Sequence, residues 1–91
     1  MQHKNSKKSW LIVELIGKFV REKRLELSKS QRILAYEFGV EKSLLNRIEN
    51  ATNETKIISL FTICEMLGVK PSDLLKYVEK ELPKDFSTLD E

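Results

Sequence analysis

The hydrophobic residues of the chain recur at intervals of three and four positions, which is the spacing of one face of an α-helix. From Ser9 to about Leu25 they form a single apolar stripe, made of Trp10, Leu11, Leu15, Ile16, Phe19 and Val20. Shorter segments with the same spacing follow at about 31–37, 41–49, 56–67 and 71–82. The pattern predicts five helices and no convincing strand, so the expected fold class is all-α with an extended N-terminal helix.

Polar residues mark where the first two helices begin. Ser9 is a plausible N-cap for the first helix, because its hydroxyl can accept from a free backbone N–H. The sequence "LSKS" (27–30) interrupts the apolar pattern, and Ser30 can cap a second helix that opens at Gln31. Ser28 with Gln31 also has the form of a capping box, so either serine can mark this boundary.

Glycine and proline residues mark the later boundaries. Gly39 can adopt the left-handed backbone of a helix end without a steric cost, and Gly68 can end the fourth helix in the same way. Pro71 suits the first turn of a fifth helix, where its missing N–H is not needed, and Pro83 ends that helix. The polar residues 50–55 form a loop between the third and fourth helices.

The same periodicity predicts the residues of the core. The expected buried side chains of the later helices are Leu34, Ala35, Phe38, Leu45, Ile48, Ile57, Leu60, Ile63, Cys64, Leu67, Leu74, Leu75 and Val78. The chain has 91 residues, of which 41% are hydrophobic and 33% are charged. These values are typical of one small globular domain.

The segment 31–49 predicts a sharp corner between two short helices. Ala35 is small enough to let two helix backbones cross closely, Gly39 turns the chain, and Val40 fills the space beneath the turn. Leu45 and Ile48 hold the following helix against the core. Such a helix-turn-helix can present its second helix to the major groove of DNA.

From about Ile16 to Leu75 the sequence resembles the lambda-repressor-like helix-turn-helix domains, also called the Cro/C1 or XRE type. The residues that carry the resemblance are Arg24, Ser30, Gln31, Leu34, Ala35, Gly39, Val40, Leu45, Glu49, Leu67, Gly68 and Val69. The resemblance implies a five-helix domain at 9–82. We expect a flexible basic arm at 1–8 before it and an acidic tail at 83–91 after it.

The resemblance also implies roles for individual residues. Arg24 and Glu49 occupy the positions of an interior ion pair that links the first helix to the end of the third. Gln31 and Asn50 occupy phosphate-contacting positions, and Lys29 can add another phosphate contact. The positions that contact DNA bases in this family are Glu41, Lys42, Ser43, Asn46 and Arg47.

The sequence departs from the family pattern at several positions. Lys29 stands where an apolar residue is common, Ala51 stands where glycine is common, and Glu41 replaces the usual Ser or Thr. A carboxylate at position 41 suits the helix dipole but is repelled by phosphates, unless it accepts from cytosine N4. Three further positions that tend to be polar in the family are apolar here: Ile33, Tyr36 and Leu44. They can form a partner surface, contact a thymine methyl group, or be scattered exposed residues.

Charge is distributed unevenly along the chain. Residues 1–56 contain 12 Lys/Arg and 7 Asp/Glu, for a net charge of +5, whereas residues 57–91 contain 4 and 7, for −3. A basic half suits a polyanion, although a solvated surface with chance asymmetry fits the counts equally well. No apolar run is long enough to span a membrane, and the single cysteine, Cys64, excludes an internal disulfide, so a cytoplasmic location is expected.

The sequence offers no candidate apparatus for catalysis or cofactor binding. It has no Gly-rich phosphate loop and no cysteine–histidine or serine–histidine pair near the core. His3 has no cysteine or histidine companion at ligand spacing, so we expect no metal site. No small-molecule ligand is evident from the sequence either. We therefore expect a protein that is not an enzyme and has no cofactor.

These patterns together predict a sequence-specific DNA-binding regulator of transcription. One such module contacts few base pairs, so we expect a homodimer on a roughly palindromic site in double-stranded DNA. Candidate dimer residues in and after the fifth helix are Leu74, Leu75, Tyr77, Val78, Leu82 and Phe86, some of which must fill the core instead. The length suits phage repressors, restriction–modification controllers and antitoxin-like regulators. The alternative is a protein-interaction module that keeps the fold without specific DNA recognition.

Overall fold

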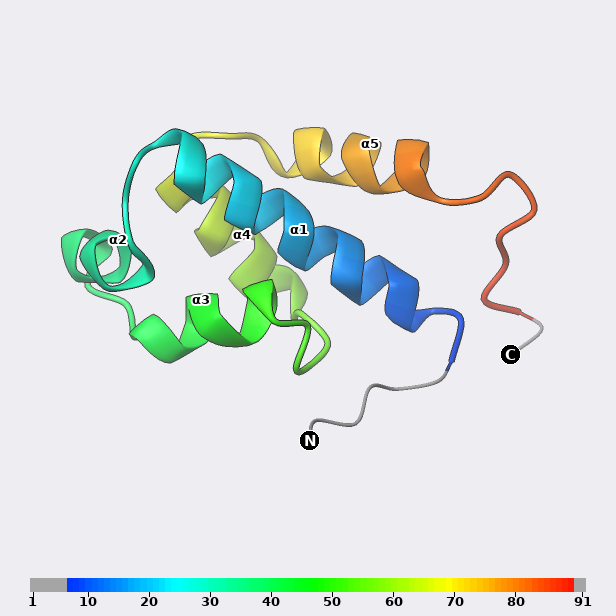
Figure 1. The fold of residues 1–91 in the computed structure, drawn as a ribbon, viewed down its shortest axis with the longest axis horizontal. Helices are drawn as coiled ribbons and strands as arrows, with labels where there is room; N and C mark the ends of the chain where they lie inside the picture. The colour runs from blue at the N-terminus through cyan, green and yellow to red at the C-terminus, as the bar shows by residue number, and fades with distance from the viewer. Residues whose placement is uncertain (1–6, 90–91) are drawn as a thin grey trace.

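The computed structural model describes residues 7–89, which form five α-helices and no strand (Figure 1). The helices are α1 (Trp10–Glu26), α2 (Gln31–Phe38), α3 (Lys42–Glu49), α4 (Ile57–Leu67) and α5 (Pro71–Glu81). The predicted all-α, five-helix fold is confirmed, and the predicted helix ends lie within one or two residues of the observed ones. None of the helices in this part of the chain is long and apolar enough to cross a bilayer.

Helix α1 is the longest helix and organises the others. It runs through the middle of the molecule, with α3 on one side and α5 on the other (Figure 1). It contacts α3, α4 and α5, whereas α2 packs mainly on α3. As a result, α2 and α3 form a separate corner at one end of the molecule.

Local chemistry accounts for the helix ends. The Ser30 hydroxyl accepts from the backbone N–H of Ile33 at 3.1 Å, so Ser30 caps α2. Ser28 lies before this cap in a left-handed conformation with φ 57°, so the alternative capping box at Ser28 is wrong. Ser9 precedes α1 but its side chain makes no capping hydrogen bond, so the predicted cap is absent there. Pro71 is the first residue of α5, as predicted.

The two glycines that end α2 and α4 have the predicted conformation. Gly39 has φ 68° and Gly68 has φ 72°, and each is the C-cap of its helix. A side chain would be strained in this left-handed region, which is why glycine can end these helices without cost.

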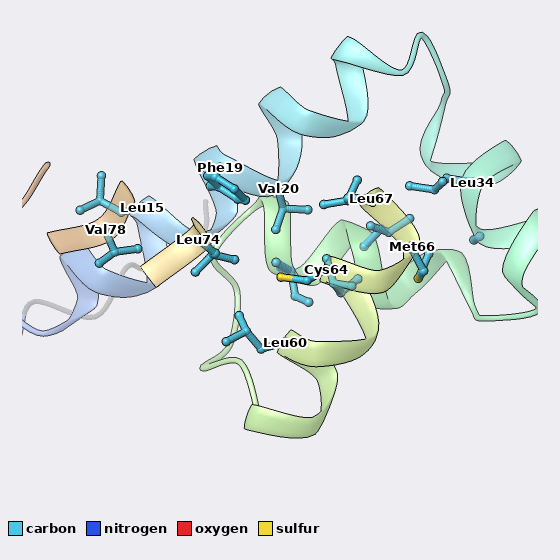
Figure 2. Packing of buried hydrophobic residues seen from close by; sticks show 14 residues of the cluster. Leu15, Phe19, Val20, Leu34, Leu60, Cys64, Met66, Leu67, Leu74 and Val78 are labelled. Atoms are coloured by element: carbon cyan, nitrogen blue, oxygen red, sulfur yellow. The ribbon is translucent and has the colours of Figure 1, made fainter. Parts of the chain in front are cut away.

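The core lies where α1, α4 and α5 meet and continues beneath α2 and α3 (Figure 2). Its fully buried side chains are Val20, Leu34, Leu45, Ile63, Cys64 and Leu74. Each large apolar side chain that leaves water contributes about 1.5–3 kcal/mol to folding. Phe19 of α1 also packs on Tyr77 of α5, with ring centroids 5.4 Å apart, so Tyr77 joins the two helices.

Three expected core residues are exposed instead: Phe38, Ile57 and Leu75. Phe38 and Ile57 lie at helix ends, where neighbouring helices cover less of the apolar face. Leu75 is about 100° around α5 from the buried Leu74, because an α-helix has 3.6 residues per turn. The predicted core was therefore wrong at these positions.

The termini of the described chain lie near each other. Lys7 and Lys8 precede α1 and are exposed, whereas the rest of the predicted basic arm, including His3, lies outside the described residues. After α5, the backbone N–H of Phe86 donates to the carbonyl of Pro83 at 3.0 Å, and Phe86 is half-buried. It lines a shallow hollow together with Trp10 and Leu11 of α1. Residues 90–91 of the predicted acidic tail are also outside the described range.

Candidate nucleic-acid interface

The corner between α2 and α3 has the tight geometry that its sequence predicts. Ala35 is 2% exposed, and its carbonyl accepts from the N–H of Val40 at 3.0 Å. Val40 packs against the core beneath the turn. The N–H of Gly39 donates to the carbonyl of Tyr36 at 3.2 Å. These contacts fix the direction in which α3 leaves the corner.

Helix α3 presents one polar face to solvent. Leu45 and Ile48 are buried, and Leu44 packs against the core. The exposed side chains of this helix are those of Lys42, Ser43, Asn46 and Arg47, and the exposed Glu41 immediately precedes it. All five residues expected to contact bases therefore lie on or next to one accessible surface.

Within this face the polar side chains form two groups. Lys42, Ser43 and Asn46 line one surface hollow. Arg47 borders a different hollow, between α3 and the loop that contains Asn53 and Lys56. The hydroxyl of Ser43 donates to the Glu41 carboxylate at 3.3 Å, which holds that carboxylate at the N-terminus of α3.

Arg24 and Glu49 connect α1 to the end of α3. The Arg24 Nε donates to Glu49 Oε2 at 2.6 Å, and its Nη2 donates to Oε1 at 2.9 Å. The two side chains are 10% and 1% exposed, respectively. The hydrogen bond to Glu49 raises the pKa of Arg24, while burial acts in the opposite direction. This bidentate contact is the interior ion pair expected from the resemblance.

The guanidinium of Arg24 makes a third contact, which fixes the start of the corner. Its Nη1 donates to the backbone carbonyl of Lys29 at 2.7 Å. Arg24 therefore joins α1, the segment before α2, and the end of α3 through one side chain.

Gln31 has a more specific environment than the sequence indicated. Its Nε2 donates to Glu49 Oε1 at 3.0 Å, and its Oε1 accepts from Asn46 Nδ2 at 3.4 Å. Its side-chain amide is thus engaged within the protein. The first backbone N–H groups of a helix lack intrahelical partners, so the α2 backbone is the better group to meet a phosphate here.

The other expected phosphate-contacting residues lie on either side of α2 and α3. Lys29 Nζ pairs with Glu37 at 2.6 Å, in a half-exposed arrangement that contributes little to stability. Asn50 is exposed at the end of α3. It lines a broad groove with Lys18 and Arg21 of α1.

The sequence pattern gave Gly17 no role at this surface and placed Trp10 only in the apolar stripe of the first helix. Gly17 lies in the middle of α1, and a Cβ there would overlap the backbone carbonyl oxygen of Ile48. The indole Nε1 of Trp10 donates to the carbonyl of Ala51 at 3.2 Å, which ties α1 to the turn after α3. A signal for Gly17 was present, because a glycine inside a helical pattern costs about 1 kcal/mol relative to alanine and can mark a packing requirement.

Cys64, the single cysteine and a potential nucleophile, belongs to the core. It is fully buried, and burial together with the nearby Asp73 raises the pKa of its thiol. Within residues 7–89, His, Cys, Asp and Glu form no cluster of three or more that could hold a metal ion. Cys64 therefore acts here as a small apolar side chain.

Comparison with known proteins agrees with this geometry. Residues 20–74 match a family model described as helix-turn-helix. The chain is also 36% identical over 64 residues to the control protein C.BamHI of Bacillus amyloliquefaciens, an alignment that covers 69% of this chain and 79% of the relative. No solved structure gives a significant match.

Together with the five-helix fold, these matches identify a DNA-binding regulator of transcription rather than an enzyme. The chain belongs to the Cro/C1-type, or lambda-repressor-like, helix-turn-helix family.

Proposed function

We propose that the protein represses or activates transcription by binding a specific, roughly palindromic operator as a homodimer, with α3 in the major groove. The observation that carries the proposal is the arrangement of α3, whose apolar side is buried while Lys42, Ser43, Asn46 and Arg47 face solvent. A helix of this kind fits the major groove, where each base pair presents a distinct pattern of donors and acceptors.

The chemistry of the α3 face suggests how bases are read. Lys42 and Arg47 can donate to O6 and N7 of guanine, and Asn46 can pair with adenine. Ser43 can either donate or accept. Glu41 can accept from cytosine N4, and its position at the N-terminus of α3 is favoured by the helix dipole.

Phosphate contacts would position α3 in the groove. The N-terminus of α2 directs backbone N–H groups outward, which suits an anion. Lys29 and Asn50 lie near the two ends of this surface, and Lys18 and Arg21 extend the positive charge along α1. Such contacts provide affinity without sequence information, and they make binding sensitive to salt.

The burial of its apolar side chains argues against the fifth helix as the proposed dimer surface. Leu74 and Val78 are buried, and Tyr77 and Leu82 pack against the core. Phe86 is half-buried, so Leu75 is the exposed member of the predicted set. Helix α5 therefore lacks the broad apolar face that a dimer contact would need.

Helix α4 offers a more suitable surface. Ile57, Ile58 and Phe61 lie in its first turns and are 61%, 74% and 54% exposed. Three neighbouring large apolar side chains are costly to leave in water, so a self-complementary contact would bury them. We therefore place the dimer contact at α4, with half-sites about one helical turn of DNA apart.

Among small regulators of this family, the similarity to a control protein favours the controller type. Small regulators of this family often control themselves, so DNA from upstream of its own gene is the natural first probe. The exposed Ile33 and Tyr36 on α2 leave room for a protein contact in addition to DNA.

Fluorescence anisotropy with that DNA and a scrambled duplex, over a series of salt concentrations, tests the proposal. We expect preference for the native duplex and a steep loss of affinity as salt rises. Arg47→Ala should weaken specific binding by about 1–3 kcal/mol, the value of one good base contact. The control is Lys76→Ala, which removes one positive charge from an exposed position of α5 and should bind almost as the parent does. Helix α5 lies on the opposite side of α1 from α3 (Figure 1).

If neither duplex binds, selection from random sequences identifies whether any operator exists. Failure of that selection to enrich a sequence would reject specific DNA recognition. Binding by Arg47→Ala equal to the parent would reject the role assigned to Arg47.

A further inference from the structure

We propose that Gln31 is a positioning residue that fixes the orientation of the Asn46 amide, so that Asn46 selects adenine over guanine. The proposal rests on the proposed function, because it concerns how α3 reads a base. It depends on four side chains that form one hydrogen-bonded chain from the interior to the surface: Arg24, Glu49, Gln31 and Asn46.

At the interior end of this series of hydrogen bonds, the donors and acceptors are fixed. Glu49 accepts two hydrogen bonds from Arg24, and as a carboxylate it has only acceptors to offer. The group of Gln31 that faces Glu49 Oε1 must therefore be its NH₂, which donates at 3.0 Å. The reverse orientation would place two oxygens against each other. The ion pair thus determines which way the Gln31 amide points.

The orientation of the Gln31 amide in turn determines the orientation of the Asn46 amide at the surface. Because the NH₂ of Gln31 faces inward, its Oε1 faces Asn46 and can only accept. The NH₂ of Asn46 must then face Gln31, and it donates at 3.4 Å. Asn46 retains one N–H and its Oδ1 for a ligand. These two groups lie beside Lys42 and Ser43, on the exposed face of α3.

One donor and one acceptor match adenine. In the major groove adenine presents N7 as an acceptor and N6–H₂ as a donor, whereas guanine presents two acceptors, N7 and O6. An unrestrained asparagine can turn its amide and offer both N–H groups to guanine. With one N–H held by Gln31, Asn46 has a single donor left, and its Oδ1 would meet guanine O6 unfavourably.

The contact also explains why Gln31 sits between two helices. It is the first residue of α2, Asn46 is in the second turn of α3, and Glu49 is in the last turn. A change in the angle between α2 and α3 would break the hydrogen bonds that Gln31 makes to Glu49 and Asn46. Base selection by Asn46 therefore depends on the same corner that positions α3.

The test begins with an operator obtained by random-sequence selection with the parent protein, which examines the proposed function separately. Every single-base variant of that operator is then titrated with the parent, Gln31→Met, Asn46→Ala and the double variant. Methionine keeps the length of glutamine but removes both hydrogen-bonding groups. Gln31→Ala serves as a second variant, and circular dichroism verifies that each protein is folded.

We expect one position at which the parent prefers adenine to guanine by about tenfold or more, and at which Asn46→Ala abolishes the preference. Gln31→Met should reduce the adenine/guanine ratio at that position towards one and leave the ratios at other positions unchanged. Adding Gln31→Met to Asn46→Ala should not change that ratio further.

Other outcomes would overturn the proposal. A parent-like adenine/guanine ratio in Gln31→Met, or a uniform loss of affinity for every sequence, would show that Gln31 acts on phosphates or on folding alone. An Asn46-dependent position that prefers a base other than adenine would reject the assigned orientation. If no operator is selected at all, the proposed function fails first. The geometry is then tested without DNA, by the side-chain amide resonances of Asn46, which Gln31→Met should shift.

Discussion

The backbone of Gly17 in α1 lies directly against the carbonyl oxygen of Ile48 in α3, with no side chain between the two helices. A Cβ at Gly17 would overlap that oxygen and would lie 3.0 Å from the carbonyl oxygen of Glu49. This close approach sets how deeply α3 packs against α1. It also brings Glu49 within reach of Arg24, so one glycine supports both the position of α3 and its ion pair.

Gly17→Ala should therefore destabilise the fold, although alanine is the better helix former. The added methyl group meets backbone atoms, which cannot move aside as a flexible side chain can. We expect a loss of about 1–3 kcal/mol in the free energy of unfolding, the usual cost of overpacking. Urea denaturation measures it, with the exposed neighbour Lys18→Ala as the control. An alanine variant as stable as the parent would contradict the close approach.

Glu49→Gln should be more damaging than the removal of an exposed carboxylate. It leaves the Arg24 guanidinium buried without its counter-charge, for an expected loss of about 3–5 kcal/mol. The matched control is Glu37→Gln, which removes a carboxylate from the half-exposed pair with Lys29 and should cost less than about 1 kcal/mol. Equal losses for the two variants in urea denaturation would show that burial does not distinguish these pairs.

Ala51→Gly should increase stability slightly. Ala51 has φ 52°, a left-handed conformation that costs a residue with a side chain about 1–2 kcal/mol. Glycine removes that cost but makes the unfolded chain more flexible, and this entropy lowers the stability by about 0.4–1 kcal/mol. We expect a net gain of about 0 to 1.6 kcal/mol in the free energy of unfolding, measured by thermal or urea unfolding. Ala35→Gly, at a buried helical position, is the control and should destabilise; a similar loss for Ala51→Gly would refute the prediction.

Ile58→Ser should weaken self-association while leaving the monomer folded, because the side chain is exposed. Sedimentation equilibrium measures the dimer dissociation constant directly. Leu75→Ser makes a comparable change on α5 and should have little effect. The opposite ranking of the two variants would return the dimer contact to α5, and a parent protein that is monomeric at micromolar concentration would remove the dimer from the proposal.

The Cys64 thiol should be unreactive towards a thiol reagent in the native protein and reactive after unfolding, because it is fully buried. Its raised pKa also gives a direction for stability against pH. The unfolded thiol ionises at about pH 8.5, while the folded thiol keeps its proton to higher pH. The contribution of the protonated Cys64 thiol to the free energy of unfolding is therefore complete below about pH 8.5 and is lost as the pH rises further. Cys64→Ala should show a smaller decline over that range, and an identical decline would exclude this cause.

The sequence by itself determined the number of helices, their approximate limits and the corner between α2 and α3. These features depend on local chemistry: the spacing of apolar residues within each helix, the capping hydroxyl of Ser30, and the left-handed backbone of Gly39 and Gly68. The positions shared with a known family added the partnership of Arg24 and Glu49, which lie 25 residues apart and carry no local signal for each other.

Only the tertiary structure decided which apolar side chains were covered. Periodicity assigns a residue to a face of its own helix, but burial depends on whether another helix reaches that point. This is why Phe38 and Ile57 were expected in the core and are exposed at helix ends. It is also why the apolar residues of α5 proved to be mostly core, while α4 retains exposed ones.

The same reason applies to the site. The sequence placed Gln31 and Asn46 on the proposed DNA-binding surface, but the orientation of their amides depends on Glu49, which reaches them only in the folded chain. Gly17 likewise has no role within α1 and acquires one only where α3 crosses it. Local patterns determine elements, whereas distances between elements determine which groups meet.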